Sequence, residues 1–282
     1  MGLGTDLYKR LILHKDVGAS KNKGPHFWDE VHSLQWYTDL YEEPVLDIMD
    51  RPKELIIGDA TGSTMSYAGV GILGRPTDES GHPWNILLPE VMHELQPELK
   101  LIVILRNPVD RMYSAYNYHS HFKRADLPVG AEGFHEYVKR QLDVMKGCVG
   151  EDGEIISPCV QKNMGMFEQL AKGIYSMFLP SWINTFTQDK MHFMRMEDYA
   201  KNIATHMEQV CKYLELRPPL ADEMDEMASL AVWNKRQGNG AERGSTAGEM
   251  MAETRKMLGE FYAPFNKKLA DILEDDRYLW LD

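Results

Sequence analysis

Three short segments of the chain are almost continuously apolar: residues 54–58 (ELIIG), 101–105 (LIVIL) and 191–196 (MHFMRM). Strands of a parallel sheet are covered on both faces, so they lack the alternation of polar and apolar positions that is typical of half-exposed strands. Each of the three segments is followed by, or ends in, polar residues. The pattern predicts three buried, parallel strands at these positions.

Longer segments with helical spacing lie between or after these strands, at residues 108–122, 134–146 and 254–273. Strands that alternate with helices predict an α/β fold, here a three-layer sandwich with a central parallel sheet. Ligands of such folds bind at the carboxyl ends of the strands. The polar residues at those ends are therefore the first candidates for a functional site.

Composition narrows the class of protein. The chain has 282 residues, of which 43% are hydrophobic and 26% charged, and this describes a globular protein rather than a disordered one. No apolar run approaches the roughly 18 residues that cross a bilayer, and no N-terminal stretch reads as a signal peptide. The net charge of −12 argues against non-specific binding of nucleic acid. A local basic groove for a small anion remains compatible with it.

Cysteine and histidine patterns give no metal site. The three cysteines form no CxxC spacing, and the ten histidines are scattered without an HExxH motif. Cys211 lies in an apolar helical pattern, which predicts a buried free thiol. Cys148 and Cys159 flank a polar, glycine-containing segment that a disulfide could close.

The segment at residues 101–118 is the most informative for function. The predicted strand delivers Arg106 to its carboxyl end, and Asn107 and Pro108 are suited to begin a helix there. A helix N-terminus favours an anion, and a guanidinium can bind a phosphate with two hydrogen bonds. Ser114 offers a hydroxyl farther along that helix. Without other information, a capped helix with a solvated polar face explains the same residues.

Residues 106–116 (RNPVDRMYSAY) resemble the 3′-phosphate-binding motif R-x-P-x-x-R-x-x-S-x-Y of PAPS-dependent sulfotransferases. The chain is most similar to the Golgi carbohydrate group of that family, which modifies N-acetylgalactosamine 4-sulfate and heparan sulfate. Four more segments follow the order of the family: GTDLYKRL at 4–11, KGPHFW at 23–28, GDATGSTM at 58–65 and ETRKMLGEFYAPFNKKL at 253–269.

The resemblance implies one sulfotransferase domain over residues 1–282 with a P-loop-NTPase-like fold. It implies PAPS (3′-phosphoadenylyl sulfate) as sulfate donor and PAP as product. Arg106 and Ser114 would hold the 3′-phosphate, and Thr5 belongs to the segment similar to the 5′-phosphosulfate loop. Lys235 and Arg236 match a loop that closes over the nucleotide, although a solvated surface loop has the same composition.

Two departures from the family pattern affect the expected site. The family loop reads K-x-G-T-T after a buried strand, whereas this chain begins M-G-L-G-T-D. We therefore expect a fold without its first strand, that is, an N-terminally incomplete domain. The second departure is Gly24, which stands where the family has a carboxylate that acts as general base.

Three residues are candidates for the catalytic work. His26 is the first, because imidazole can accept a proton near neutral pH. Lys23 and Asp59 are the others. His26 could instead pack beside Phe27 and Trp28 as part of an aromatic wall, and Asp59 could serve only to cap the chain before Thr61.

The predicted reaction is in-line transfer of a sulfuryl group from PAPS to a hydroxyl of a carbohydrate, without a metal. A catalytically impaired PAPS- or PAP-binding homologue and an enzyme acting on a small-molecule alcohol are the alternatives. A phosphotransferase of nucleotide-kinase type is disfavoured because GxxxxGK[ST] is absent. No nucleic-acid partner is expected.

The resemblance also implies a disulfide between Cys148 and Cys159. Disulfides form and persist in oxidising compartments and are rare in the cytosol. We therefore expect the Golgi lumen, with a membrane tether that is absent from this chain. A cytoplasmic protein is the alternative.

Overall fold

The described part of the chain forms two compact units, each made of two separate stretches of sequence. The computed structural model describes residues 3–30, 32–50, 55–66, 87–118, 130–150, 159, 168–230 and 249–281. The first unit comprises Met1–Leu105 and Ser181–Arg236, and the second comprises Arg106–Pro180 and Gln237–Asp282. The single domain over 1–282 that the sequence predicts remains a prediction.

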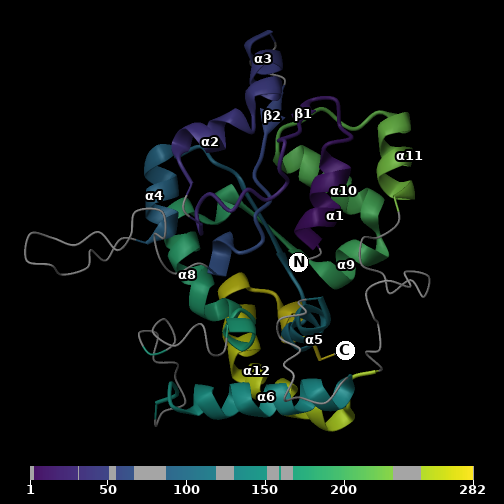
Figure 1. Ribbon diagram of the computed structural model, residues 1–282. Helices are drawn as coiled ribbons and strands as arrows, with labels where there is room; N and C mark the ends of the chain where they lie inside the picture. Colours follow the sequence, from purple (N-terminus) through teal and green to yellow (C-terminus); the bar gives the residue numbers. More distant parts are fainter. Residues whose placement is uncertain are drawn as a thin grey trace, which may run out of the picture. The chain divides into compact units, whose positions relative to one another are not determined.

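Helices dominate both units, and the described strands belong to the first unit (Figure 1). The described elements of the first unit are α1 (Leu3–Leu11), β1 (Val17–Gly18), α2 (Leu34–Asp39), α3 (Glu42–Asp50), β2 (Ile56–Ile57), η1 (Thr64–Ser66), α4 (Leu88–Leu95), β3 (Leu101–Leu105), η4 (Gln188–Lys190), β4 (Met191–Arg195), α9 (Met196–Lys201), α10 (Ile203–Tyr213) and α11 (Ala221–Ser229). Those of the second are α5 (Pro108–Tyr118), α6 (Ala131–Lys146), α12 (Ala252–Leu273) and η5 (Asp276–Leu279). Helix α8 (Tyr175–Phe186) contains the boundary between the two units.

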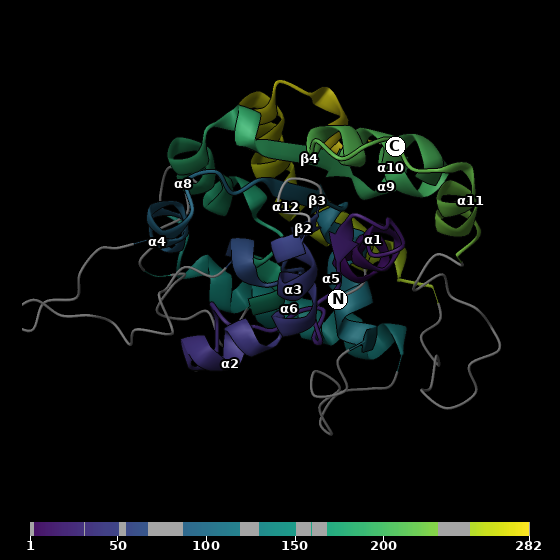
Figure 2. The ribbon, with the colours of Figure 1, turned by 90° about the horizontal axis from the view of Figure 1, so that it is seen from above.

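The described strands form two parallel pairs. β1 pairs with β2, and the register places Val17 opposite Ile56. β3 pairs with β4 over five residues, from Leu101 opposite Met191 to Leu105 opposite Arg195 (Figure 2). All pairing among the described strands is parallel, as the continuous apolar runs predict.

The predicted strands are confirmed, with small changes at their ends. The strand expected at 101–105 is β3. The strand expected at 191–196 ends at Arg195, because Met196 already begins α9. Of the segment expected at 54–58, the structure describes residues 55–58, and among these Ile56–Ile57 pairs as a strand. The sequence did not reveal β1, because two residues are too few to produce a pattern.

The core of the first unit forms where α1 packs with β4 and the helices that follow it. Its members are all less than 6% exposed: Leu7, Met194, Tyr199, Met207, Val210 and Met227. Each helix contributes its apolar face, while β4 contributes an inward-facing methionine. This packing fixes α1, and therefore Thr5 in its first turn, to the sheet.

A buried polar network reinforces the position of α1. Arg10 is fully buried and forms an ion pair with Asp6 at 2.8 Å, one helical turn away. The hydroxyl of Tyr199 in α9 donates to the same carboxylate at 2.7 Å. The Arg10 guanidinium also donates to the backbone carbonyls of Met227 and Leu230. Because buried charges are tolerated only when paired and hydrogen-bonded, this network specifies one position for α1.

The second unit has a separate aromatic core built from α5, α6, α8 and α12. Met112, Phe134 and Tyr262 are completely buried there. The Tyr262 hydroxyl donates to the carbonyl of Leu170 at 2.8 Å. A β-carbon at Gly173 would lie 2.6 Å from the Tyr262 hydroxyl, so glycine at this position allows the ring to pack.

The cysteines behave as predicted. Cys148 and Cys159 form a disulfide, and their sequence separation is 11 residues. Cys211 is a buried free thiol, and burial raises its pKa to about 11. Within the described residues, none of the helices has the length and apolar composition needed to cross a membrane.

Candidate active site

The first unit brings Thr5 and Lys23 together. Thr5 lies in the first turn of α1, and Lys23 belongs to the segment after β1. The Lys23 Nζ donates a hydrogen bond to the Thr5 Oγ1 at 2.9 Å. Burial lowers the pKa of the Lys23 ammonium, and the nearby carboxylate of Asp59 opposes that shift. The arrangement places one positive charge beside the N-terminal turn of α1, where an anion is favoured.

Gly24 lies where two backbone segments approach each other closely. The Ala60 N–H donates to the carbonyl oxygen of Lys23 at 3.1 Å. A β-carbon at Gly24 would lie 3.3 Å from the Ala60 oxygen and 3.4 Å from the Thr61 Cα. A side chain at this position therefore requires the facing backbone to move by a few tenths of an ångström. The absence of a carboxylate here coincides with this close crossing of the two segments.

His26 is held by contacts on both its backbone and its ring. Its N–H donates to the Thr61 Oγ1 at 3.1 Å. Its ring Nδ1 lies 3.1 Å from each carboxylate oxygen of Asp29 and 3.3 Å from the Ser63 Oγ. Ser63 also donates to the Asp29 carboxylate. A proton on Nδ1 shared with Asp29 leaves Nε2 as the nitrogen that can accept a proton.

The backbone of His26 adopts φ 57°, a left-handed conformation that non-glycine residues rarely take. The bonds from Thr61 and Asp29 hold it there. Its side chain is 26% exposed, so the ring remains accessible to a substrate. His26 thus combines a constrained backbone, an oriented ring and solvent access, as expected of a residue that transfers protons.

Asp59 follows β2 and carries out the capping role that the sequence suggests. Its Oδ1 accepts the Thr61 N–H at 2.8 Å, and its Oδ2 accepts the Tyr37 hydroxyl at 3.2 Å. The residue is accessible to water. The surrounding protein nevertheless raises its pKa by desolvation, while the bonds from Thr61 and Tyr37 oppose the shift. Asp59 thus caps the chain before Thr61 and interacts electrostatically with Lys23 and His26. These contacts are typical of a positioning residue rather than of a catalytic base.

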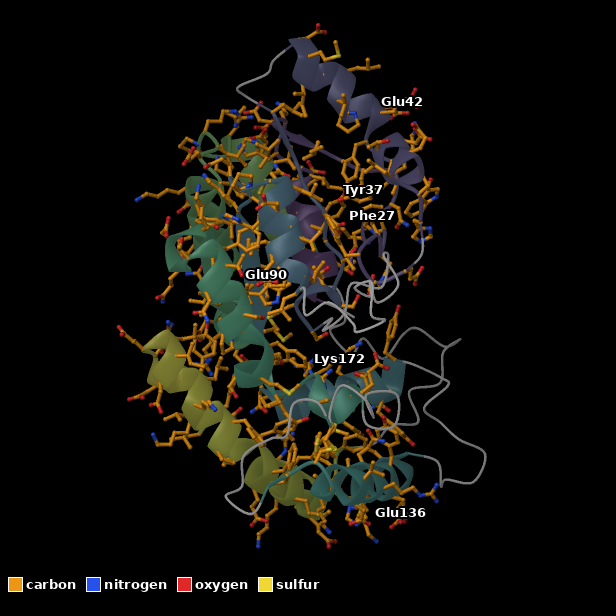
Figure 3. The ribbon with its side chains drawn as sticks, turned by 90° about the vertical axis from the view of Figure 1, so that its left-hand side faces the viewer. Phe27, Tyr37, Glu42, Glu90, Glu136 and Lys172 are labelled. Atoms are coloured by element: carbon orange, nitrogen blue, oxygen red, sulfur yellow. A yellow bond between two sulfur atoms is a disulfide. The ribbon has the colours of Figure 1, made fainter. Side chains whose placement is uncertain are left out.

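Three contacts of this cluster are not apparent from the sequence. Asp29 lies three positions after His26, and this spacing is the only sequence feature that could have indicated it. Ser63 belongs to a segment that resembles the family, but its contact with the His26 ring is formed only by the fold. Tyr37 lies in α2 and is likewise brought to the cluster by the fold. The Tyr37 ring stacks on Phe27 with centroids 4.3 Å apart, and the two lie side by side (Figure 3).

Arg106 and Ser114 belong to the second unit, where both are partly buried. The predicted helix start is confirmed, because the Asn107 side chain accepts the Val109 N–H at 3.0 Å. The carbonyl of Arg106 accepts the Tyr175 hydroxyl at 2.9 Å, which fixes its backbone. Ser114 lies eight positions farther on, in α5.

Arg111 occupies the second arginine position of the motif but serves the fold. Its guanidinium donates to the side chain and the backbone carbonyl of Gln169. It therefore secures α5 to the chain segment before α8. Lys235 and Arg236 lie outside the described residues. Among the described residues, no cluster of three or more histidine, cysteine or acidic side chains could hold a metal ion.

Comparison with known families identifies the family of the chain. The family model described as "Sulfotransferase domain" matches residues 4–262. The chain belongs to the sulfotransferase domain family. The match includes residues of both units and all candidate site residues described above.

Curated relatives and one solved structure agree with this. The chain is 31% identical to the mouse protein named carbohydrate sulfotransferase 15, over 98% of this chain and 52% of that protein. It is 25% identical to mouse heparan sulfate glucosamine 3-O-sulfotransferase 3B1, over 93% of this chain and 58% of that protein. The chain therefore spans about half the length of the curated relatives it matches.

The fold class is confirmed by a crystal structure of a sulfotransferase from Alicyclobacillus acidocaldarius. The TM-score is 0.58 with 18% sequence identity, and the match covers 96% of this chain and 91% of that chain. The chain thus has the α/β, P-loop-NTPase-like fold that its sequence predicts. At this identity the likeness concerns the fold only.

Proposed function

We propose that this sulfotransferase transfers the sulfuryl group of PAPS to a hydroxyl of a carbohydrate. The observation that carries the proposal is the family match over residues 4–262, which contains every described candidate residue. The names of the curated relatives, a carbohydrate sulfotransferase and a heparan sulfate sulfotransferase, support a carbohydrate acceptor. The whole-chain resemblance supports transfer rather than binding alone.

Each unit offers groups whose chemistry suits one part of the donor, which carries a phosphate at one end and a phosphosulfate at the other. Arg106, with its backbone held by Tyr175, and Ser114 would bind the 3′-phosphate. A guanidinium suits this task because it donates two parallel hydrogen bonds to phosphate. Thr5 and Lys23 would bind the 5′ end, since their contact places a hydroxyl and a charge at the start of α1.

His26 would accept the proton of the acceptor hydroxyl at Nε2, while Asp29 stabilises the imidazolium that results. The acceptor oxygen then forms a bond to sulfur, and the bond from sulfur to the phosphate oxygen breaks. The electron pair of that bond leaves with PAP, and Lys23 neutralises the developing charge on the leaving oxygen. PAPS supplies the sulfuryl group. Positioning and charge stabilisation dominate such transfers, as they do in phosphoryl transfer.

The disulfide supports an oxidising compartment. Cys148 is 1% exposed and bonded to Cys159, and such bonds are rare in the cytosol. Together with the carbohydrate acceptor, this supports the Golgi lumen, where we propose that the protein is held by a tether outside these 282 residues.

Two measurements test the proposed function. The first is transfer of labelled sulfate from PAPS to a panel of carbohydrates and small alcohols; absence of transfer to every carbohydrate would contradict the proposal.

The second measurement is calorimetry of PAP binding, with ATP as comparison. Arg106→Ala should lose roughly 2–5 kcal/mol of PAP affinity, the usual cost of removing one partner of a charge pair. Lys267→Ala, which changes a solvent-exposed lysine of the same unit, is the control. Unchanged affinity in Arg106→Ala would refute the assignment of Arg106.

A further inference from the structure

The helix that faces the His26 cluster carries aromatic rings that the proposed chemistry does not use. Trp36 lies in α2, and His32 stacks on it with centroids 3.8 Å apart and planes 17° apart. We call these two residues the ring pair. Both are partly exposed, and neither belongs to the hydrophobic core of either unit. Large aromatic faces that remain accessible to water are features of binding surfaces more often than of packing.

Contacts on the neighbouring residue fix the ring pair close to the proposed site. Tyr37, which follows Trp36, stacks on Phe27 at 4.3 Å, and Phe27 follows His26 in the chain (Figure 3). The Tyr37 hydroxyl donates to Asp59 at 3.2 Å. Consecutive Cα atoms are about 3.8 Å apart, so the backbone of Trp36 lies next to that of Tyr37, although its ring leaves the helix in a different direction. The ring pair is therefore carried by the helix that is anchored to the His26 cluster through Tyr37.

The charge of this region is unusual for binding a sulfated polymer. The described part of residues 19–66 contains eight acidic side chains, and its basic residues are Lys21 and Lys23. Lys21 forms an ion pair with Glu42 at 3.2 Å, and Lys23 is bonded to Thr5. The Glu30 Oε2 lies 3.3 Å from the Nε2 of the His32 ring. A highly sulfated acceptor would meet net negative charge here and be repelled.

We infer that the ring pair is an acceptor subsite, and that it takes a sugar of low charge by stacking rather than a polyanion by ion pairing. This inference rests on the proposed function, because it specifies the acceptor of the same site. The C–H face of a pyranose ring carries partial positive charge, which is complementary to the negative face of an indole ring. Such contacts need no cations, and this agrees with the acidic surroundings.

The test combines direct binding with kinetics on the full chain. The probes are three oligosaccharides of equal length: a neutral chitooligosaccharide, unsulfated chondroitin and chondroitin 4-sulfate. Binding is followed by calorimetry and transfer by labelled PAPS. We expect the neutral probe to bind at least as tightly as the others, with little dependence on salt. Tighter binding of the sulfated probe, with affinity falling steeply as salt rises, would overturn the inference.

Variants then locate the binding to the ring pair. Trp36→Ala should raise the KM and the dissociation constant for the neutral probe about fivefold, which corresponds to the roughly 1 kcal/mol of one aromatic contact, and should change kcat little. Trp36→Phe keeps a ring and should restore most of the affinity. Leu34→Ala, an exposed change in the same helix, is the control. Equal effects of Trp36→Ala and Leu34→Ala would refute the subsite.

Glu30→Gln gives an independent measure of the charge argument. It removes one negative charge beside His32 and should improve binding of the sulfated probe more than binding of the neutral one. No change in this ratio would contradict the repulsion that we infer. A protein that binds the neutral probe through Trp36 yet transfers no sulfate would refute the proposed function and leave the subsite standing. Sulfate transfer that does not depend on Trp36 would refute the subsite and leave the proposed function standing.

Discussion

His26 depends on a small set of neighbours for its proposed role. The Asp29 carboxylate contacts its Nδ1, and the Ser63 hydroxyl is shared between the carboxylate and the ring. This arrangement fixes the imidazole plane and directs the proton to one nitrogen. Asp29 is thus a positioning residue, because it acts on the acceptor hydroxyl only through His26.

His26→Ala should lower the turnover number by roughly 10²–10⁴-fold, the range over which a general base contributes. PAP affinity by calorimetry should stay nearly constant, since the proposed nucleotide contacts are made by other side chains and not by the His26 ring. Asp29→Asn should reduce turnover less and shift the pH–rate profile, a readout that a purely structural role would not move. His93→Ala is the matched control, because its ring packs against Phe186 instead. Full turnover in His26→Ala would assign the base to another group.

Some residues of the candidate site could be predicted from the sequence, and some of their contacts could not. His26, Lys23, Thr5 and Asp59 could be selected from the motif, and the fold brings them into one unit. The contacts that Asp29 and Ser63 make with His26 could not, because a hydrogen-bond partner is determined by tertiary contacts rather than by a pattern. The sequence indicated a missing carboxylate at Gly24, but only the structure revealed the backbone crossing that a side chain there would disturb.

At the scale of elements, the start of α11 depends on one buried carboxylate. Glu223 accepts the N–H groups of Leu220 and Lys15 and binds the Arg217 guanidinium with both oxygens at 2.7 Å. It is 3% exposed. The bond from Arg217 holds the pKa of Glu223 well below its usual range, and the backbone donors add to the effect. One side chain thus caps α11 and ties it to the chain after α1.

Because the folded state lowers the pKa of Glu223, its contribution to stability is present above the ordinary glutamate range and is lost as pH falls below it. Glu223→Gln should lower the free energy of unfolding by roughly 2–4 kcal/mol at pH 7. The difference from the parent should shrink at about pH 3, which urea denaturation at both pH values measures. Glu226→Gln changes an exposed residue of the same helix and should show neither effect. A difference independent of pH would exclude the charge as its source.

The elements that the sequence predicts well are those whose burial produces a strong pattern. β3 and β4 are apolar throughout because parallel strands are covered on both faces. The start of α5 is encoded locally by Asn107 and Pro108. By contrast, β1 is two residues long and is defined only by its pairing with β2, which no local pattern can reveal.

At the scale of the whole molecule, the disulfide makes the stability of the protein depend on the redox conditions around it. Removing it with Cys148→Ser and Cys159→Ser together should destabilise the protein by about 2–3 kcal/mol, because the unfolded chain regains the entropy of a short loop. The melting temperature under oxidising and reducing conditions measures this. The parent should lose stability on reduction, and the double variant should not respond. An equal response from both would show that the bond contributes nothing in solution.

The described strands of the first unit have edges without a strand partner. Among the described residues, β1–β2 and β3–β4 form separate two-stranded sheets, although all four strands belong to one unit and pair in parallel. Each of the four strands therefore presents one edge without a strand partner in the described part of the chain. Unpaired edges of apolar strands are costly and favour aggregation.

We predict that the edge of β3 that has no strand partner among the described residues stays open in solution. Hydrogen exchange provides the decisive measurement. Amides on that edge of β3 should exchange quickly, while those bonded to β4 are protected, because only the latter are held in the ladder. Protection of the amides on both edges of β3 would show that another segment of the chain pairs there, and the prediction would then be wrong.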